Sequence, residues 1–562
     1  MEMMIQLSKH HFRKFKRLRN KKMMKSFHLI KNSLGIAIIL FLGSCRSSDS
    51  ENTLTGGGVS AVSFNLLGAE YADSGKLSGQ ASLTKENITN SGNQVQRHSI
   101  LVTPGSVITA ELAPSSDVSK VLPNASSGMN SIAAITGNPL TPGMQFRIIA
   151  YRSNGNYHTH QDYTVGQSAT SMMLDNGAAY NIVVYSYGTA SLPAISSGEQ
   201  NNISSAVVNY NDTNRDFMYQ KLDFTPQNYT NNTLDITLRH KVAQITTIVN
   251  SGSLGSITNI TGGVLTPHYS NGVVPLSSGV MSGRTILSTG VSLDFSGFNT
   301  STATSAPVFV NANTTGSFSA NMTIGGITKA FNLPNSFKIT PEKKSNLTIN
   351  MVKCGAYIGP NTNPANFREF MCQNLGATAG TDPFDNTKAG NHGAKYQWGA
   401  NTGELNRYYS QSDDQSNAGE ISGWSTTSYK PDGSWSDTGK TGNDPCPTGY
   451  RVPTSAQWQA ILANNNNNVE RVGTPWTDSP TNFASALYFR NPSNVRVLML
   501  PVAGYRGSNK GILSSRGSTG TYWSSSEVTG TNRGYYIDIS SSNASVGTNL
   551  RANGFSVRCI AG

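Results

Sequence analysis

The sequence predicts a mainly β protein in which tandem antiparallel β-sandwiches precede a C-terminal α+β module. Charged residues make up only 13% of the 562 residues, and glycine alone contributes 55. From about residue 59 to residue 350, short segments with alternating apolar residues are separated by turn residues, as in half-buried strands. All six tryptophans and four of the five cysteines lie beyond that region. A chain of this length exceeds one hydrophobic core, so several domains are expected.

The N-terminal 44 residues are typical of a bacterial lipoprotein signal peptide. The apolar run 34–42 follows a basic start and is shorter than the about 20 residues that a membrane-spanning helix needs. The small residues Gly43 and Ser44 then precede Cys45, as a signal peptidase requires. We therefore expect the mature chain to begin at Cys45, whose thiol carries lipid such as palmitate and anchors the protein to the outer membrane.

The charge of the chain is concentrated in this signal segment. Ten of the 43 Lys and Arg residues, but only one of the 31 acids, precede Cys45. The mature chain is therefore nearly neutral, and no nucleic-acid partner is expected. Residues 45–58 are small and polar and indicate a flexible tether. Asp49 and Glu51 resemble the acids in surface-export signals of some Gram-negative lipoproteins, which favours exposure on the cell surface.

Residues 59–352 are predicted to form two β-sandwich subdomains, 59–200 and 201–352. Runs such as 146–151 and 242–249 have the composition and alternation of strands. The turn residues between such runs favour the positive φ angles of tight turns, and they include Asn154-Gly155 and Asn176-Gly177. We expect antiparallel sheets packed face to face.

Four segments of this region resemble the fimbrillin-like proteins of Bacteroidetes surfaces in sequence, order and spacing. They are 146–151, 180–187, 216–219 and 238–245. The resemblance implies a two-part β-sandwich and lipoprotein export, and in pilus-forming members it implies polymerisation by strand donation. Such assembly fills an incomplete sandwich with a strand from a neighbouring subunit, so other fimbrial subunits are expected partners.

Arg97 is the candidate site of proteolytic processing. In pilus-forming relatives a protease cuts after an arginine and opens the acceptor groove, and Arg97 is followed by the apolar stretch 100–102. The alternative is that Arg97 is an ordinary loop residue.

Four cysteines remain once Cys45 carries lipid, and in an exported protein an even set predicts two disulfides. Three pairings are open. We favour Cys354 with Cys372 across a local hairpin-like segment, and Cys446 with Cys559, which ties the last strand to the middle of its domain. A metal site is disfavoured because the chain has no Cys-x-x-Cys spacing.

Residues 353–562 resemble the Fibrobacter succinogenes major paralogous domain, a cell-surface module related to the C-type-lectin-like fold. The resemblance rests on segments in the order of that family, namely 370–377, 444–454, 500–506, 520–526 and 554–559. It implies an α+β, lectin-like module. Independently of the resemblance, Thr454 and Gln457 have the spacing of a capping box ahead of Trp458, which predicts a helix at this point.

The sequence offers no catalytic constellation, and we do not expect an enzyme. His392 is the single histidine of the module, and the cysteines are better explained as disulfides. The sugar-binding strings of calcium-dependent lectins are absent, so no cofactor or metal is expected. Four aspartates could still offer oxygen ligands to Ca²⁺, although solvated loop carboxylates are the favoured interpretation: Asp382, Asp385, Asp413 and Asp414.

Trp424 and Trp435 are the candidate ligand contacts. Both lie in the polar loop 401–443, and exposed indole faces stack on sugars or anchor protein contacts. Packing into the module's core, or pinning of the loop, is nevertheless the favoured interpretation of these two residues.

These expectations together predict a non-enzymatic surface lipoprotein that binds a glycan or a protein through its C-terminal module. Because such a module does not readily donate a strand to a following subunit, we expect a fimbrial tip subunit or a stand-alone adhesin. The alternatives are a structural fimbrial subunit or assembly protein without a ligand, and an enzyme acting on surface polysaccharide.

Overall fold

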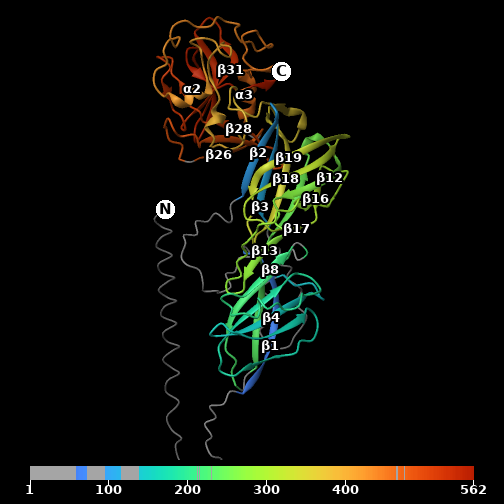
Figure 1. The fold of residues 1–562 in the computed structure, drawn as a ribbon. Coiled ribbons are helices and arrows are strands. Elements are labelled where there is room, and N and C mark those ends of the chain that lie inside the picture. The colour runs from blue at the N-terminus through green and yellow to red at the C-terminus, as the bar shows by residue number, and fades with distance from the viewer. Residues whose placement is uncertain are drawn as a thin grey trace, which may run out of the picture. The chain divides into compact units, whose positions relative to one another are not determined.

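The computed structural model describes residues 58–72, 95–115, 138–211, 213, 216–228, 231–463, 466–473 and 475–562. The predicted signal peptide, Cys45 and the tether up to residue 57 lie outside these ranges. Within them the chain is mainly β, as predicted, and its strands form two sandwich regions and a C-terminal module (Figure 1). None of the described helices has the length and apolar character needed to cross a bilayer.

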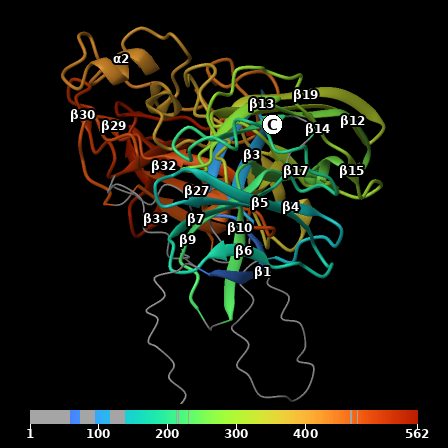
Figure 2. The same cartoon turned by 60° about the horizontal axis from the view of Figure 1, so that its bottom comes forward.

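The first sandwich region is built on a seven-stranded sheet (Figure 2). Its strands are β1 (Val59–Glu70), β4 (Gln145–Arg152), β5 (Tyr157–Thr164), β6 (Met172–Asp175), β7 (Tyr180–Ser186), β9 (Met218–Phe224) and β10 (Asn232–His240), in the order β5-β4-β7-β9-β10-β1-β6. The centre of the sheet is buried on both faces, since Ile182 of β7 joins one apolar cluster and Val183 joins another. The second cluster includes Val208 and Val274 of the paired strands β8 (Val207–Asn211) and β13 (Asn271–Pro275).

The second sandwich region packs two sheets around one core. One sheet contains β2 (Gln96–Thr103), β3 (Ser106–Pro114), β11 (Ala243–Asn250), β15 (Phe295–Ser296), β16 (Thr302–Ser305), β17 (Val308–Val310) and β20 (Lys344–Lys353). The other contains β12 (Ile257–Thr266), β14 (Val291–Ser292), β18 (Thr315–Ile324) and β19 (Ile327–Lys338). Leu347 and Ile349 of β20 meet Phe318 of β18 in the core. Because side chains alternate along a strand, Thr348 and Asn350 lie on the opposite, outward face.

The predicted division of the sandwiches at residue 200 does not match the strand pairing. Strands β2 and β3 precede β4 in the sequence but belong to the second sandwich, where β2 pairs with β3 and β3 pairs with β20. Strands β9 and β10 follow residue 200 but belong to the first sandwich. The parallel pairs β1–β10 and β11–β20 join strands far apart in the chain. Turn residues predict pairing between consecutive strands only, so they do not indicate pairs between strands that are far apart in the chain.

The C-terminal module begins at Cys354 and combines mostly short strands with two short helices, α2 (Gln411–Ser416) and α3 (Ser455–Leu462). The predicted capping box is confirmed: the Thr454 hydroxyl accepts from the Gln457 N–H at 3.1 Å, and Gln457 Oε1 accepts from the Thr454 N–H at 2.9 Å. The strands are β21 (Gly355–Tyr357), β22 (Phe367–Glu369), β23 (Lys395–Gln397), β24 (Tyr408–Tyr409), β25 (Tyr450–Arg451), β26 (Asn468–Val472), β27 (Ala486–Arg490), β28 (Arg496–Pro501), β29 (Tyr505–Arg506), β30 (Leu513–Ser514), β31 (Gly520–Val528), β32 (Arg533–Ile539), β33 (Ala544–Leu550), β34 (Gly554–Phe555) and β35 (Ile560–Ala561).

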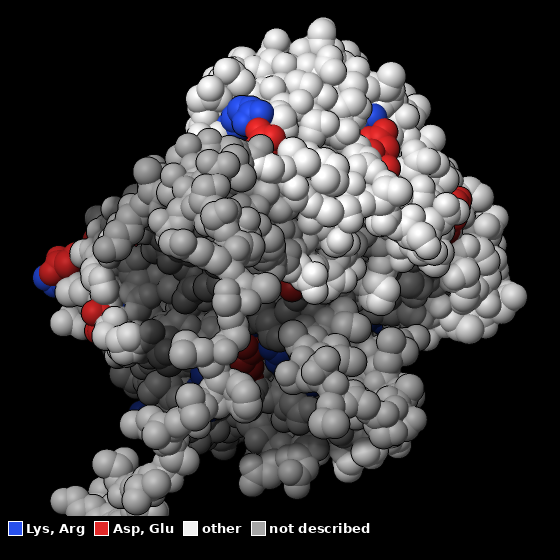
Figure 3. Space-filling view, turned by 90° about the horizontal axis from the view of Figure 1, so that it is seen from below, with Lys and Arg blue, Asp and Glu red and all other residues white. Residues whose placement is uncertain are grey.

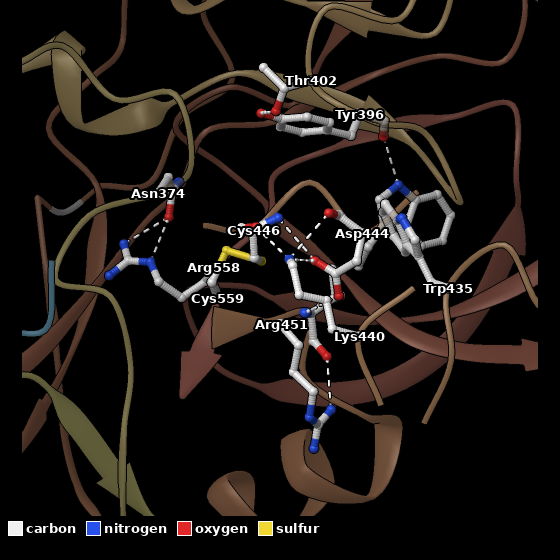
Figure 4. The surroundings of a disulfide bond; sticks show 12 residues. Asn374, Tyr396, Thr402, Trp435, Lys440, Asp444, Cys446, Arg451, Arg558 and Cys559 are labelled. Carbon is white, nitrogen blue, oxygen red and sulfur yellow. Dashed lines mark hydrogen bonds and ion pairs between the residues drawn. A yellow bond between two sulfur atoms is a disulfide. The ribbon is translucent and has the colours of Figure 1, made fainter. Parts of the chain in front are cut away.

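Both favoured disulfides are present, Cys354–Cys372 and Cys446–Cys559. Figure 4 shows the second one among polar side chains. Asp444 accepts the N–H groups of Cys446 and Val452, each at 2.9 Å, and thereby orders the chain on both sides of the turn that precedes β25.

Candidate ligand-binding groove

The C-terminal module is joined to the second sandwich by a turn that enters it. This turn, between β2 and β3, presents the carbonyls of Pro104 and Gly105 to the N–H groups of Cys372 and Cys354, at 2.7 and 2.8 Å. A Cβ atom on Gly105 would lie 2.1 Å from Glu369 Oε1 and 2.6 Å from the Tyr450 hydroxyl, so a larger residue there would have to displace these two side chains. Val107 packs in the core of the module. The junction is therefore a packed interface rather than a loose linker.

A second contact lies at the free edge of β2. The Ser99 N–H, which has no strand partner on that side, donates to Asp382 Oδ2 of the module at 2.7 Å. The same oxygen lies 3.4 Å from Nδ1 of His98, and hydrogen bonding to Asp382 raises the pKa of His98. The other carboxylate oxygen accepts from the Phe384 N–H at 2.9 Å, which fixes the carboxylate in place. Asp382 thus fastens the edge of the sandwich to the module.

Beside this contact lies an open groove of about 840 Å³. Strands β2, β3, β11 and β20 of the second sandwich form one part of it, and the module forms the other. The sandwich contributes Val95, Arg97, Ser99, Thr109, Ala110, Glu111, Asn250, Thr348 and Asn350, whereas the module contributes Asp382, Phe384, Asp385, Asn386, Thr387, Arg490, Ser493, Asn494, Val495 and Arg496. Most of these side chains are polar, so the groove suits a polar ligand.

The floor of the groove is the outward face of the sheet. Strand register places Thr109 opposite Asn350, and Asn350 opposite Asn250. The Asn250 amide donates to Asn350 Oδ1 at 2.9 Å and accepts from the Thr302 hydroxyl at 2.9 Å. A polar row therefore crosses four strands, because each of these residues alternates with a core residue on its own strand.

A second, parallel row lies next to it. Arg97 is opposite Glu111, and Glu111 is opposite Thr348. The Arg97 Nε–H donates to Glu111 Oε2 at 2.8 Å, with both side chains more than a third exposed. Among the described residues, the terminal guanidinium nitrogens of Arg97 and the second oxygen of Glu111 have no other partner, so a ligand could bind them.

The wall contributed by the module is held by Glu470. Its carboxylate binds the guanidinium groups of Arg490 and Arg496, and Arg496 also lies over the Tyr488 ring at 3.9 Å. Burial alone would raise the pKa of Glu470, but the hydrogen bonds from Arg496 and Arg490 lower it. The two arginines are therefore rigid and paired. On the molecular face seen in Figure 3, charged side chains are few and scattered.

The two candidate tryptophans are buried, which contradicts their role as ligand contacts and agrees with the favoured packing into the core. The exposed fractions of Trp424 and Trp435 are 5% and 1%. The Trp424 indole N–H donates to the Ala552 carbonyl at 3.1 Å, and that of Trp435 to the Asn443 carbonyl at 3.0 Å. The indoles satisfy their polar group inside the module, so they pack its core instead of facing solvent.

The four aspartates do not converge on one site. Asp382 and Asp385 lie at the groove, whereas Asp413 and Asp414 lie in α2. Among the described residues, no three His, Cys, Asp or Glu side chains are placed to hold a metal ion. The interpretation of Asp414 as a solvated loop carboxylate is wrong, because the residue is completely buried.

Asp414 is the centre of a buried charge cluster. Its carboxylate lies 2.7 Å from Arg506 Nε, 2.6 Å from an Arg516 nitrogen and 3.4 Å from Lys395 Nζ. Burial opposes ionisation, but Lys395 and the two arginines lower the pKa of Asp414. Burial lowers the pKa of Lys395 to about 8 and that of nearby His392 to about 3, so His392 is neutral near pH 7. This cluster joins α2 to β23 and β29 and lies outside the groove.

Arg97 lies within β2 rather than in a loop. Its backbone is part of the β2–β3 ladder, and its side chain pairs with Glu111. A protease acting after Arg97 would need β2 to separate locally from β3. The processing role stays a prediction.

Apart from Arg97, which the sequence suggests only as a processing site, the groove residues of the sheet are not indicated by the sequence as binding residues. The alternation Leu347-Thr348-Ile349-Asn350 does place two polar residues on the outward face, and that signal is readable. What the sequence does not indicate is that segments 382–387 and 490–496 lie over this face.

Comparisons with known proteins give limited matches. Residues 482–560 match a family described as a domain of unknown function, DUF8237. No curated protein matches the chain. A candidate cell adhesion protein from Bacteroides uniformis is 14% identical over 37% of this chain and 86% of its own, with a TM-score of 0.26.

Two further solved structures are similarly distant. A candidate cell adhesion protein from Bacteroides fragilis is 11% identical over 52% of this chain and 93% of its own, with a TM-score of 0.29. A candidate polysaccharide binding protein from Bacteroides thetaiotaomicron is 10% identical over 37% and 82%, with a TM-score of 0.24. Similarity of this size assigns no family to the chain, and its resemblances to fimbrillin-like proteins and to the Fibrobacter module remain predictions.

Proposed function

We propose that this chain is a surface-anchored, non-enzymatic adhesin that holds a glycan or protein ligand at its C-terminal module, as a fimbrial tip subunit or a stand-alone lipoprotein. The observation that carries the proposal is the open polar groove at the base of the module. Its volume of about 840 Å³ is in the range of ligand sites, and its walls are fixed by the turn at Gly105 and by Asp382.

The charged side chains of the groove support binding rather than catalysis. Arg97 is paired with Glu111, and Arg490 and Arg496 are paired with Glu470. These paired side chains form a pre-ordered set of hydrogen-bonding groups, which is what binding of a polar ligand requires.

The position of the last strand, β35, supports the proposal that this end of the module does not act as a donor strand for a neighbouring subunit. Strand β35 pairs with β25, and Cys559 just before it is bound to Cys446. Residues 559–561 are therefore fixed within the module and are not free to fill a neighbour's groove. A structural fimbrial subunit or assembly protein without a ligand is the second candidate function.

The test uses bacterial cells that display the full chain, with Cys45→Ser as the variant that lacks the lipid site. Adherence to a panel of immobilised glycans and matrix proteins is measured together with protease shaving of intact cells. We expect adherence and shaving for the natural chain, and release of the protein from the membrane for Cys45→Ser. Surface display without adherence to any surface of the panel would contradict the adhesin.

Assembly is tested separately on material sheared from the same cells. Electrophoresis without boiling would show a heat-sensitive ladder for a fimbrial subunit, with an N-terminus at His98 if Arg97 is the processing site. A single band that remains with the membranes and begins at acylated Cys45 would identify a stand-alone lipoprotein.

A further inference from the structure

We infer that the groove is a composite carbohydrate site, in which the outward face of the second sandwich supplies the floor and the C-terminal module supplies the wall. The inference rests on the proposed adhesin function and names its ligand class, a neutral, hydroxyl-rich oligosaccharide. It also implies that the module on its own carries only part of the binding site.

The floor offers the mixture of donors and acceptors that sugar hydroxyls require. Hydroxyl groups of Thr109 and Thr348 and the amide of Asn350 belong to adjacent strands and line the groove. A sugar hydroxyl both donates and accepts, so amide and hydroxyl side chains match it better than groups that only donate or only accept. The strand ladder spaces these groups regularly, as successive rings of a linear oligosaccharide would need.

The charge balance of the lining favours a neutral ligand. Three cations, Arg97, Arg490 and Arg496, and three carboxylates, Glu111, Asp382 and Asp385, line the groove. A polyanionic ligand would select an excess of Lys or Arg, and a cationic peptide would select an excess of carboxylates. Neither excess is present.

The lining also argues against a protein ligand. Protein interfaces depend on a few large apolar or aromatic anchors that enter matching pockets. The one aromatic side chain of the lining, Phe384, is 8% exposed and belongs to the core of the module. A polar lining without an accessible aromatic face fits hydrogen bonding to an oligosaccharide better than anchoring of a protein.

The site is ordered before the ligand arrives. The floor residues lie on β3 and β20, which pair over nine consecutive residue pairs. The wall is held by Glu470 and by the Asp382 contact to Ser99. Such pre-ordering reduces the entropy cost of binding, so a site that relies on hydrogen bonds can still bind measurably.

The test is a pair of matched substitutions in the full mature chain. Thr348→Trp fills the floor of the groove with an indole. Thr323→Trp is its control, because Thr323 also faces outward from a strand, β18, of the same sandwich but does not line the groove. Asn350→Ala removes one floor amide, with Asn321→Ala on β18 as its control. Binding is measured on an array of neutral, acidic and basic oligosaccharides, and folding is checked by thermal unfolding.

We expect neutral oligosaccharides to bind the natural chain, Thr348→Trp to weaken binding at least tenfold, and Asn350→Ala to weaken it about fivefold, with both controls unchanged. Equal binding by the natural chain and Thr348→Trp would overturn the groove as the site while the adhesin stands. Adherence of displaying cells without binding to any oligosaccharide would overturn the ligand class alone. If Thr348→Trp unfolds, Asn350→Ala against Asn321→Ala decides the question, since equal binding by these two would overturn the contribution of the floor.

Discussion

The first sandwich and the C-terminal module are stabilised by different means, although both belong to one chain. The sandwich has a seven-stranded sheet with apolar side chains on both faces, such as Ile182 and Val183 of β7. Most strands of the module are short, although β31, β32 and β33 are not; the module also carries both disulfides and buries the charge cluster around Asp414. Where the strands are long, burial of apolar area makes the largest contribution to stability. Where most strands are short, disulfides and paired polar groups contribute more of it.

This difference teaches where each region is vulnerable. A sheet core loses stability in proportion to the apolar volume removed, and the loss remains graded. A buried ion cluster responds differently, because removing one partner leaves the other charges unpaired in an apolar interior, and this costs more stability than the intact cluster contributes. The module should therefore respond to a few specific changes far more strongly than the sandwich does.

The largest expected effect is the loss of the Cys446–Cys559 disulfide. The bond closes a loop with a sequence separation of 113, so replacing both cysteines with serine should lower the free energy of unfolding of the module by about 5 kcal/mol. Denaturant unfolding combined with hydrogen exchange read by region measures the effect. The Cys354–Cys372 disulfide, with a separation of 18, is the matched control and should cost about 3 kcal/mol. Equal losses would contradict the loop-length explanation.

The next effect is expected from Asp414→Asn. This change leaves Lys395, Arg506 and Arg516 buried without their carboxylate, and should destabilise the module by about 3 to 4 kcal/mol. Thermal unfolding of the full chain measures it. Asp413→Asn is the control, because the adjacent Asp413 pairs with the exposed Ser410 hydroxyl at 2.6 Å and its replacement should change little. Equal melting temperatures for Asp414→Asn and Asp413→Asn would contradict the stabilising role of the buried charge cluster.

Ile182→Ala probes the other side of the comparison. Ile182 is fully buried in the first sandwich, so the truncation should cost about 2 to 3 kcal/mol through lost burial and a residual cavity. Hydrogen exchange should show the loss in β4, β7 and β9 while the module keeps its protection. Loss of protection in both regions together would mean that the two unfold as one cooperative unit.

The smallest effect concerns pH at the junction. Asp382 raises the pKa of His98, with Asp385 adding to the attraction, so the folded state favours protonated His98. This stabilisation is complete below about pH 6.5, the ordinary histidine value, and is lost as the pH rises through the raised pKa. Because more than a third of the side chain is exposed, we expect less than about 1 kcal/mol. The melting temperature of the natural chain minus that of His98→Gln should fall between pH 5.5 and pH 8, and a constant difference would refute the contact.

Local features of this fold were readable from the sequence because their causes are local. The capping box at Thr454 depends on residues three positions apart, and the alternation in β20 follows from strand geometry. The favoured disulfide pairing also held, since one bond is local and the other joins the last strand to its own domain.

Features set by distant segments were not readable. The burial of Trp424 depends on Ala552, whose carbonyl accepts its indole N–H, and nothing in the polar loop around Trp424 announces that partner. The groove likewise forms where β3 and β20 lie beside segments 382–387 and 490–496, which are far from these strands in the sequence. A single sequence states which residues alternate on a strand, but not what covers their outward face.

The turn at Pro104-Gly105 has a mechanical consequence. Tension applied to the module reaches the second sandwich along two routes, the peptide bond from Lys353 to Cys354 and the main-chain hydrogen bonds that the turn receives from Cys354 and Cys372. Both routes feed β3 and β20, whose nine paired positions share the load instead of opening one at a time from a free end. If a cell is held through this module, the pulling force is therefore transmitted to a β-sheet, and it enters that sheet at the turn that contains Gly105.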